Sequence, residues 1–446
     1  MRMEEFLAQA ARVRPNENQL RLLRETPFYV FVHFSPNTYT DLEWGTGKED
    51  PAIFNPTGLD CEQWARAIKA AGAKGMVLTA KHHDGFCLWQ SAYTEHCMKN
   101  SPYKNGRGDI VREASDACRK YGLKFGFYLS PWDRNASCYG TPAYNDYYNN
   151  QLTELLTNYG EIFHVWFDGA CGEGPGGKKQ IYDFEGYIDL IRKYQPKATF
   201  FNDAGEVRWC GTESGSSGHA QWSVVPKELC YLNRGVQTGA GPFSGDLTGI
   251  YNTDEDLGAL PMAMRSEGLV FSPAETDMSI RPGWFWHKEE EPHSLDRLFD
   301  TYIRTVGGNT TFNLNVPPNR EGLFDQRDVK RLEELGEKIR ETFGNDLARD
   351  ADAAVTGAGT THPVFTLRLP EKRKIRYIVL EERIEEGQRV ELFAVYEGAG
   401  AVRHAAYTGT TIGNKKIVPL AMDTDALTVQ IRAARGPVDE LKIALF

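Results

Sequence analysis

Polar and ring-bearing side chains recur in this sequence directly after short apolar runs. Five such side chains are His33, His82, His83, Tyr128 and Asp168. Imidazole, phenol and carboxylate groups bind sugar hydroxyls directionally, and aromatic rings pack against the C–H faces of a sugar. Phosphate chemistry would instead require a glycine-rich nest with Lys or Arg, and the sequence has no such motif. A carbohydrate is therefore the favoured substrate.

Cleavage of a glycosidic bond needs two carboxyl groups, one acting as nucleophile or base and the other as acid. Asp168 is the first candidate, because the apolar run 162–167 holds it on a strand and Gly169 leaves room beside it. An Asp at this place can equally cap the following turn. Sequence alone does not choose the second carboxyl group. Its candidates are Glu206, Glu213 and Glu275.

A metal site is the alternative for the histidines. With His33 and Asp84, the His82-His83 pair could bind a metal ion, as in hydrolases that use several His and an Asp on a barrel. Neighbouring residues point to opposite faces of a strand, however. The H-x-H and H-x-x-x-H spacings that direct two rings at one ion do not occur here. We therefore expect no metal and no other cofactor.

Short apolar strands alternate with helical patterns from about residue 28 to about residue 343. The strand candidates are 28–34, 74–80, 124–130, 162–168, 198–203, 220–225, 269–274 and 310–316. This alternation predicts a parallel sheet, and the fold class is α/β, a (β/α)₈ TIM-type barrel, with a doubly wound sheet as the fallback. The G-x-G-x-x-G fingerprint of dinucleotide binding is absent.

Helices are predicted between these strands. One starts after Asp60 as N-cap and stops at Gly72, and another starts at Asp109 and closes at Gly122. Further helices are expected near 144–159, 180–195, 294–306 and 327–343. Active sites of such barrels lie at the C-terminal ends of the strands. The polar strand ends, which include Asn202-Asp203, Asn313 and Asn315, should therefore meet at one mouth.

The composition changes after about residue 350. All nine Trp and all eight Cys precede residue 287, and the tail contains four short alternating runs. The runs are VFTLRL, IRYIVLEE, RVELFAVY and ALTVQIR. They predict a small C-terminal β-sandwich. We expect a catalytic barrel over 1–347 and the sandwich over 348–446. Since the tail lacks Trp, a structural appendage is favoured over a sugar-binding module.

The chain has 446 residues and a formal charge of −10, which disfavours nucleic acid as a partner. Its apolar runs are too short for a membrane helix. The eight scattered cysteines suggest free thiols in a reducing compartment. The first residues lack an apolar targeting segment. We expect a cytoplasmic protein, or a secreted one if an export signal was trimmed. The oligomeric state is left open.

The motifs at the strand ends resemble those of the α-L-fucosidases of glycoside hydrolase family 29. The matching segments are FVHFSPNTYTDLEWGTGKEDP, FNPTGLDCEQWARAIKAAGAKGMVLTAKHHDGFCLWQS, GLKFGFYLSPWDRN, EIFHVWFDGACGEG, WCGTESG, AQWSVVP, ETDMSIRPGWFWH and TTFNLNVPPNREGLF. Together they cover nearly the whole expected barrel. The resemblance implies a retaining exo-glycosidase that acts on fucosylated glycans without a cofactor, with the Asp of W-F-D-G, Asp168, as nucleophile.

The sequence looks closest to the subgroup that cleaves α-1,3- or α-1,4-linked fucose from branched Lewis-type glycans. In that subgroup the acid/base Glu lies on a W-x-G-x-E-x-G segment, which here is Trp209 to Gly215. This resemblance favours Glu213. A broad-specificity α-L-fucosidase is the alternative, and a metal-dependent hydrolase or a catalytically silent fucose-binding protein is less favoured.

Fucose-binding groups are also implied by the resemblance. They are His33, Glu43, Trp44, His82, His83, Tyr128, Trp132, Arg281 and Trp284. Arg281 could instead form a salt bridge with Glu275 or Asp277. Because fucose has a methyl group at C6, we also expect an apolar wall formed by Phe31, Phe34 or a Trp.

Overall fold

The computed structural model describes most of the chain. The described residues are 3–201, 206–218, 220–227, 229, 256–266, 268–399 and 404–446. The predicted strand end Asn202-Asp203 and Cys230 lie outside them.

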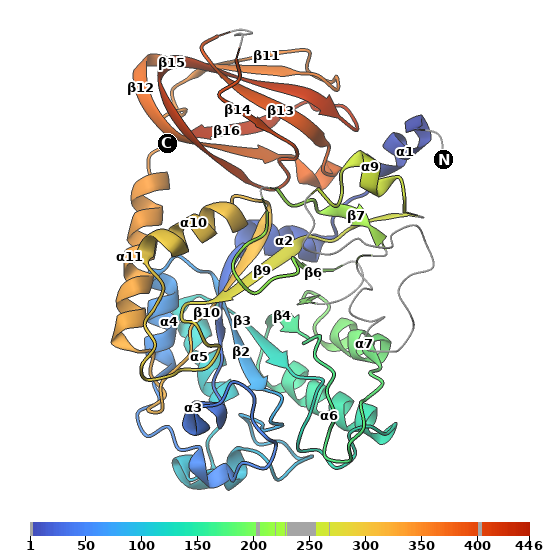
Figure 1. The fold of residues 1–446 in the computed structure, drawn as a ribbon, viewed down its shortest axis with the longest axis vertical. Coiled ribbons are helices and arrows are strands. Elements are labelled where there is room, and N and C mark those ends of the chain that lie inside the picture. The colour runs from blue at the N-terminus through green and yellow to red at the C-terminus, as the bar shows by residue number, and fades with distance from the viewer. Residues whose placement is uncertain are drawn as a thin grey trace.

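The centre of the molecule is an eight-stranded parallel sheet (Figure 1). In spatial order its strands are β5 (Thr199–Phe201), β4 (Ile162–Trp166), β3 (Lys124–Leu129), β2 (Gly75–Lys81), β1 (Phe28–Val32), β10 (Thr310–Asn315), β9 (Ala274–Ser279) and β6 (Arg208–Trp209). A parallel bridge between Phe201 and Val207 joins the two edges of this sheet. The sheet is thus a nearly closed barrel, which confirms the predicted fold class.

Two of the predicted barrel strands are wrong. The segment 220–225 overlaps β7 (Val224–Pro226), and 269–274 begins with β8 (Leu269–Phe271). These two strands pair antiparallel in a separate two-stranded sheet. The barrel uses β6 and β9 instead. Every residue of β9, AETDMS, is buried. The sequence of β9 does not predict a buried strand, because buried parallel strands usually consist of apolar residues and this one is polar.

The helices follow the predicted pattern. Asp60 caps α4 (Cys61–Ala70) by accepting from the backbone N–H of Gln63, and Asp109 caps α5 (Ile110–Tyr121) in the same way. Gly122 ends α5 with a φ of 71°, a conformation that glycine adopts without strain. The other α-helices are α1 (Met3–Ala10), α2 (Glu17–Glu25), α3 (Asn37–Thr40), α6 (Ala143–Asn158), α7 (Phe184–Tyr194), α9 (Leu260–Ala263), α10 (Leu295–Thr305) and α11 (Gln326–Phe343).

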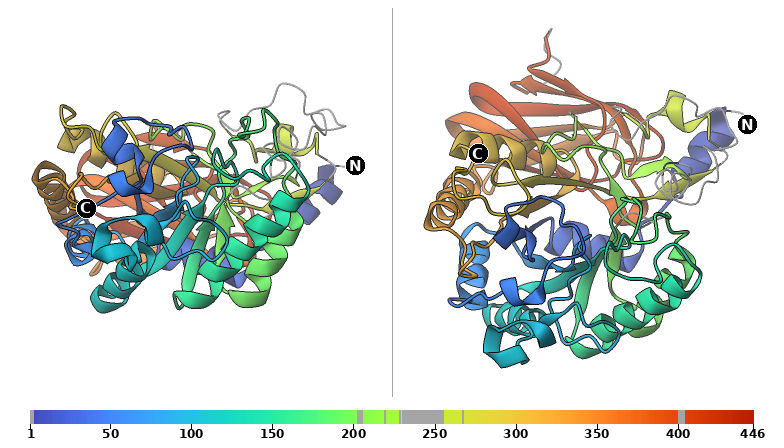
Figure 2. Two further views of the ribbon diagram at one scale, coloured as in Figure 1. Left: turned by 90° about the horizontal axis from the view of Figure 1, so that it is seen from below. Right: turned by 60° about the horizontal axis from the view of Figure 1, so that its bottom comes forward.

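The described residues also include several short 3₁₀ turns. They are η1 (Pro51–Ile53), η2 (Met98–Asn100), η3 (Tyr103–Gly106) and η5 (Ile384–Glu386). Figure 2 shows the blue-to-green helices of the barrel on the outside of the strands. Among the described residues, no helix is long and apolar enough to cross a membrane.

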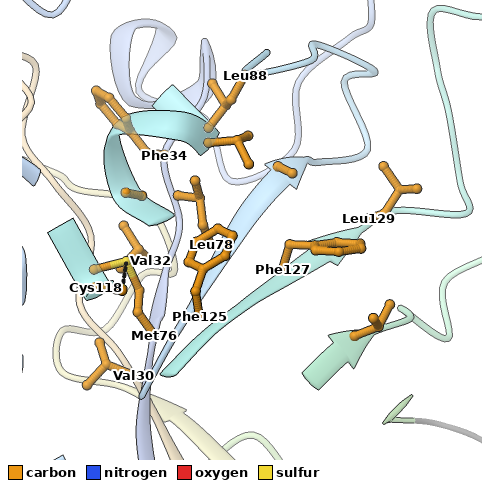
Figure 3. Packing of buried hydrophobic residues seen from close by; sticks show 14 of the residues in the cluster. Val30, Val32, Phe34, Met76, Leu78, Leu88, Cys118, Phe125, Phe127 and Leu129 are labelled. Atoms are coloured by element: carbon orange, nitrogen blue, oxygen red, sulfur yellow. Dashed lines mark hydrogen bonds between the residues drawn. The ribbon is translucent and has the colours of Figure 1, made fainter. Parts of the chain in front are cut away.

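Alternate residues of the barrel strands face two different cores. Val30 and Val32 of β1 pack with Met76 and Leu78 of β2 and with residues of the outer helices, and Figure 3 shows this layer. Tyr29, Phe31, Val77, Tyr128 and Trp166 form a second cluster. Since strand side chains alternate between faces, the second set lines the barrel interior. The outer layer holds the strands rigid, and the inner set leads to the mouth.

The C-terminal region is a six-stranded antiparallel sheet that encloses its own hydrophobic core above the barrel in Figure 1. Its strands are β11 (Asp352–Thr356), β12 (Val364–Glu382), β13 (Val390–Glu397), β14 (Tyr407–Gly409), β15 (Lys416–Ala434) and β16 (Leu441–Leu445). The predicted strands VFTLRL and IRYIVLEE are two parts of β12, which has a register shift between Arg368 and Arg373. The boundary at 347/348 falls between α11 and β11 and stays a prediction.

Hydrogen bonds attach the C-terminal region to the rest of the chain. The side-chain oxygen of Gln388 accepts from the backbone N–H of Ser223 at 2.7 Å, and the amide of Asn414 donates to the carbonyl of Leu23 at 3.0 Å. The backbone N–H of Ile417 donates to the carbonyl of Gly307 at 2.9 Å. The tail therefore buttresses the barrel.

Candidate active site

A cavity of about 190 Å³ at the C-terminal ends of the barrel strands brings together nine of the eleven predicted site residues. These are His33, Glu43, Trp44, His82, His83, Tyr128, Asp168, Glu213 and Trp284. A larger cavity of about 410 Å³ has Lys124 and Thr199, the first residues of β3 and β5, in its wall. It therefore lies at the opposite end of the barrel, and its lining includes none of the predicted site residues.

Asp168 lies just after β4, separated from its last residue, Trp166, by Phe167. The phenol of Tyr128 donates to its Oδ2 atom at 2.9 Å, and the Nε2 atom of His83 lies 3.7 Å from the same oxygen. The Oδ1 atom accepts from the backbone N–H of Ala170 at 2.7 Å. Asp168 thus caps the turn with one oxygen and holds the other among the side chains of the cavity.

Glu213 reaches the same cavity from the loop that follows β6. The indole N–H of Trp284 donates to its Oε2 atom at 3.2 Å. Partial burial raises the pKa of Glu213, and the charges of Asp168 and Glu43 raise it further, against the lowering effect of the Trp284 hydrogen bond. The raised pKa favours a proton on the carboxyl group of Glu213.

The other two candidate glutamates have structural partners instead. Glu206 forms an ion pair with Arg192. Glu275 is fully buried and accepts from the indole of Trp166 at 2.7 Å and from the amide of Asn313 at 3.0 Å. Neither residue lines the cavity. Of the three alternatives that the sequence left open, only Glu213 faces Asp168 across this space.

The three predicted histidines are buried in the wall of the cavity. The Nδ1 atom of His33 lies 2.8 Å from Oδ1 of Asn315, and that of His83 lies 2.7 Å from Oγ of Ser130. Burial lowers the pKa of all three rings, that of His33 to about 4. At neutral pH the rings are thus uncharged, so each has one donor and one acceptor nitrogen. The Nδ1 atom of His33 donates to Asn315, which leaves its Nε2 atom to accept from a hydroxyl group.

The described part of the chain shows no cluster of metal-binding side chains at the predicted histidines. Asp84 accepts from the hydroxyl of Ser35 at 2.8 Å and from the backbone N–H of Phe86 at 2.7 Å, and it does not line the cavity. No group of three or more His, Cys, Asp or Glu among the described residues has an arrangement that could hold a metal ion.

Trp132 and Arg281 are the two predicted site residues that the structure does not bring to the cavity. The centroid of the Trp132 ring lies 4.8 Å from that of His83 and 5.6 Å from that of Trp44, two residues of the cavity wall. Trp132 itself does not line the cavity. The guanidinium of Arg281 is fully buried and donates to Oδ2 of Asp328 in α11 at 2.8 Å. Arg281 does form a salt bridge, as the alternative predicted, but its partner is Asp328 and not Glu275 or Asp277.

We predict that Arg281→Met lowers the free energy of unfolding by about 3 to 5 kcal/mol, because it leaves the carboxylate of Asp328 buried without its partner. Urea denaturation followed by circular dichroism measures this, and Asp328→Asn should give a similar loss. A variant that unfolds like the parent but requires far more substrate for half-maximal rate would instead place Arg281 on the sugar.

Four further residues line the cavity, and the sequence had assigned none of them a role as a ligand. They are Phe31, Trp166, Ala170 and Asp277. Phe31 had been one of three expectations for the apolar wall, whereas Phe34 packs outside the barrel interior against Phe54 and Trp64. Asp277 was missed because its strand, β9, was not recognised. Burial, with the nearby Glu275 and Glu213, raises the pKa of Asp277 well above its ordinary value.

The fold and the site together define a barrel hydrolase with a carboxyl pair in an aromatic, histidine-rich cavity. The family model for α-L-fucosidases matches residues 28–342. The chain belongs to the α-L-fucosidases of glycoside hydrolase family 29, and α-L-fucosidase activity follows from this membership.

Individual relatives agree with this assignment. Alpha-L-fucosidase 1 of Arabidopsis thaliana is 39% identical over 443 residues, covering 92% of this chain and 83% of that protein. A crystal structure of a candidate α-L-fucosidase from Bacteroides ovatus is 42% identical, with a TM-score of 0.90, and covers all of this chain and 76% of its own. A Ruminococcus gnavus GH29 fucosidase solved in complex with fucose is 30% identical, with a TM-score of 0.82 and coverages of 97% and 95%.

Proposed function

We propose that this protein is a retaining, exo-acting α-L-fucosidase that releases α-1,3- or α-1,4-linked L-fucose from branched Lewis-type glycans. The observation that carries the proposal is the shared cavity of Asp168 and Glu213, in which Glu213 has a raised pKa. A double displacement requires one ionised and one protonated carboxyl group, and the raised pKa of Glu213 suits it to hold the proton.

In the first step an oxygen of Asp168 bonds to the anomeric carbon while the bond to the glycosidic oxygen breaks. The proton of Glu213 passes to that oxygen, and the aglycone leaves. In the second step ionised Glu213 takes a proton from water, and the water oxygen displaces Asp168 from the anomeric carbon. Both carboxyl groups end in their starting states, and the product keeps the α configuration.

Fucose is the sugar that best suits the lining. The neutral rings of His33, His82 and His83 can pair with its ring hydroxyls, and Phe31 offers an apolar surface to the C6 methyl group. Galactose would bring a 6-hydroxyl to this wall, and leaving it without a partner costs about 1 to 3 kcal/mol. The R. gnavus relative in complex with fucose supports the same substrate class.

The stereochemistry of the reaction is tested on the first product. Proton NMR of a fresh reaction should show the α anomer of fucose first, with the β anomer growing in by mutarotation. The β anomer appearing first would mean inversion and would exclude Asp168 as nucleophile. No release of fucose after a day would indicate a catalytically silent fucose-binding protein.

The proposed linkage rests on the Trp209 to Gly215 segment, which is similar to that of the α-1,3/1,4 subgroup. We expect kcat/KM for a Lewis-type trisaccharide to exceed that for a simple aryl fucoside at least about 10-fold, a difference of about 1.4 kcal/mol in transition-state binding. Parallel progress curves with both substrates measure the ratio. Fast aryl fucoside turnover with wide linkage tolerance would favour a broad-specificity enzyme.

We also propose that the protein works in a reducing compartment such as the cytoplasm. The seven described cysteines are free thiols, and Cys138 and Cys171 are partly exposed. Cell fractionation of the source organism tests this location.

A further inference from the structure

His287 joins two loops at the rim of the active-site cavity. It belongs to the segment between β9 and α10, and both of its partners belong to the segment after β1. Its Nδ1 atom lies 2.7 Å from Oδ1 of Asp41, and its Nε2 atom lies 2.7 Å from Oε1 of Glu43. Carboxylate oxygens only accept hydrogen bonds, so an imidazolium ring, which donates from both nitrogens, satisfies this geometry best.

The surroundings of His287 favour the charged ring. Burial alone would lower its pKa, but the hydrogen bonds to Glu43 and Asp41 and the charge of Glu290 raise the pKa above its ordinary value. The neighbouring backbone is shaped for this contact as well. A methyl group on Gly283 would lie 2.6 Å from Oε1 of Glu43 and 2.8 Å from the ring of His287, so this close approach depends on a glycine.

Glu43 extends the connection to the acid/base candidate. Its Oε2 atom accepts from the backbone N–H of Trp284 at 2.8 Å, and its Oε1 atom accepts from that of Phe285 at 3.3 Å. The indole of Trp284 in turn donates to Oε2 of Glu213. Hydrogen bonds therefore link Asp41, His287, Glu43 and the backbone of Trp284, and the indole of the same Trp284 binds Glu213.

We propose that His287 is a positioning residue that bridges Asp41 and Glu43 and thereby holds the indole of Trp284 against Glu213. This inference rests on the proposed role of Glu213 as the acid. His287 does not line the cavity, so it acts through Trp284 rather than on the sugar. If the bridge is lost, Trp284 can move and Glu213 is aimed less well at the glycosidic oxygen.

The consequence depends on the leaving group. A Lewis-type trisaccharide expels a sugar alkoxide, which requires a proton from Glu213, whereas α-L-fucosyl fluoride expels fluoride and depends much less on an acid. Misplacement of the acid should therefore slow the first substrate and spare the second. A purely structural weakening would slow both alike.

His287→Gln is the test variant, because Gln keeps one donor and loses the two-sided bridge. We expect kcat/KM for the trisaccharide to fall about 10- to 100-fold and that for the fluoride to change less than about 2-fold. Asp41→Asn, which weakens the other half of the bridge, should give a smaller loss of the same kind. His293→Gln is the matched control, because His293 lies on the same segment as His287, contacts Arg297 of α10 and takes no part in the bridge.

Equal losses on both substrates, or no loss on either, would overturn the proposal. Glu213→Ala separates this outcome from a failure of the proposed function. If Glu213→Ala slows the trisaccharide selectively and His287→Gln does not, the bridge is irrelevant and Glu213 is still the acid. If Glu213→Ala lacks that selectivity, the assignment of the acid itself is wrong.

A pH series gives a second readout. Because the folded pKa of His287 is raised, the bridge contributes stability fully below the ordinary His value of about 6.5 and loses it as the pH rises through the folded value. The difference in urea midpoint between the parent and His287→Gln should therefore shrink on the alkaline side. A difference that stays constant across this range would contradict an imidazolium bridge.

Discussion

Replacing Asp168 with Gly should lower kcat/KM for α-L-fucosyl fluoride by at least about 1,000-fold, because the covalent step loses its nucleophile. Even a good leaving group cannot compensate for this loss. The variant should fold, since Asp168 is partly exposed and its bonds to Tyr128 and Ala170 are local to the cavity. Initial rates of fluoride release measure the effect, and circular dichroism checks the fold.

Azide should restore turnover in the Asp168→Gly variant. It is small enough to occupy the space of the missing carboxylate and attack the anomeric carbon from the same side. The expected product is β-L-fucosyl azide, identified by NMR and mass spectrometry. Hydrolysis at the parental rate, or rescue without the β-azide, would exclude Asp168 as the nucleophile.

Replacing Glu213 with Ala should slow a Lewis-type trisaccharide by about 100- to 10,000-fold, the usual contribution of a general acid or base. α-L-fucosyl fluoride should be affected much less in the step that forms the fucosyl-enzyme. Stopped-flow measurement of fluoride release separates that step from hydrolysis of the intermediate. A variant that cleaves the trisaccharide as fast as the parent would remove Glu213 from the acid role, and Glu206→Gln is a control at a glutamate outside the cavity.

The pH dependence should follow the same carboxyl group. Since the acid must be protonated, kcat/KM for the trisaccharide should fall as the pH rises through the pKa of Glu213. Burial and the charges of Asp168 and Glu43 raise that pKa, so the fall should come at a higher pH than for an ordinary Glu, near 4.3. This limb should be absent in Glu213→Ala.

Most barrel elements could be predicted from local patterns. The strands β1 to β4 are apolar runs, and the caps Asp60 and Asp109 lie at helix starts. β9 could not be predicted in this way, because Glu275 and Asp277 interrupt its pattern. Their polar partners, such as the indoles of Trp166 and Trp209, come from remote segments. These hydrogen bonds offset the cost of burying the two carboxyl groups, and they cannot be predicted from the sequence of the strand alone.

The long bent strand β12 illustrates the same limit. Its charged middle, from Arg368 to Arg373, looks like a loop between two strands in the sequence. In the structure its two halves pair along β15 on either side of a register shift. Strand continuity is decided by backbone pairing with a partner that lies about fifty residues further along the chain.

The sequence by itself determined the family and placed Asp168 at the end of a rigid apolar strand, since both depend on residues that are adjacent in the chain. The resemblance of one short segment favoured Glu213, but only the tertiary structure shows that Glu213 shares the cavity with Asp168, that Glu206 and Glu275 lie outside it, and that Arg281 does not reach it. The physical reason is that the partners of a carboxyl or guanidinium group decide whether it is held in an ion pair or is free to bind the substrate. Those partners reach it from loops and helices far apart in the sequence, and burial then decides which groups pair with each other and which face the substrate.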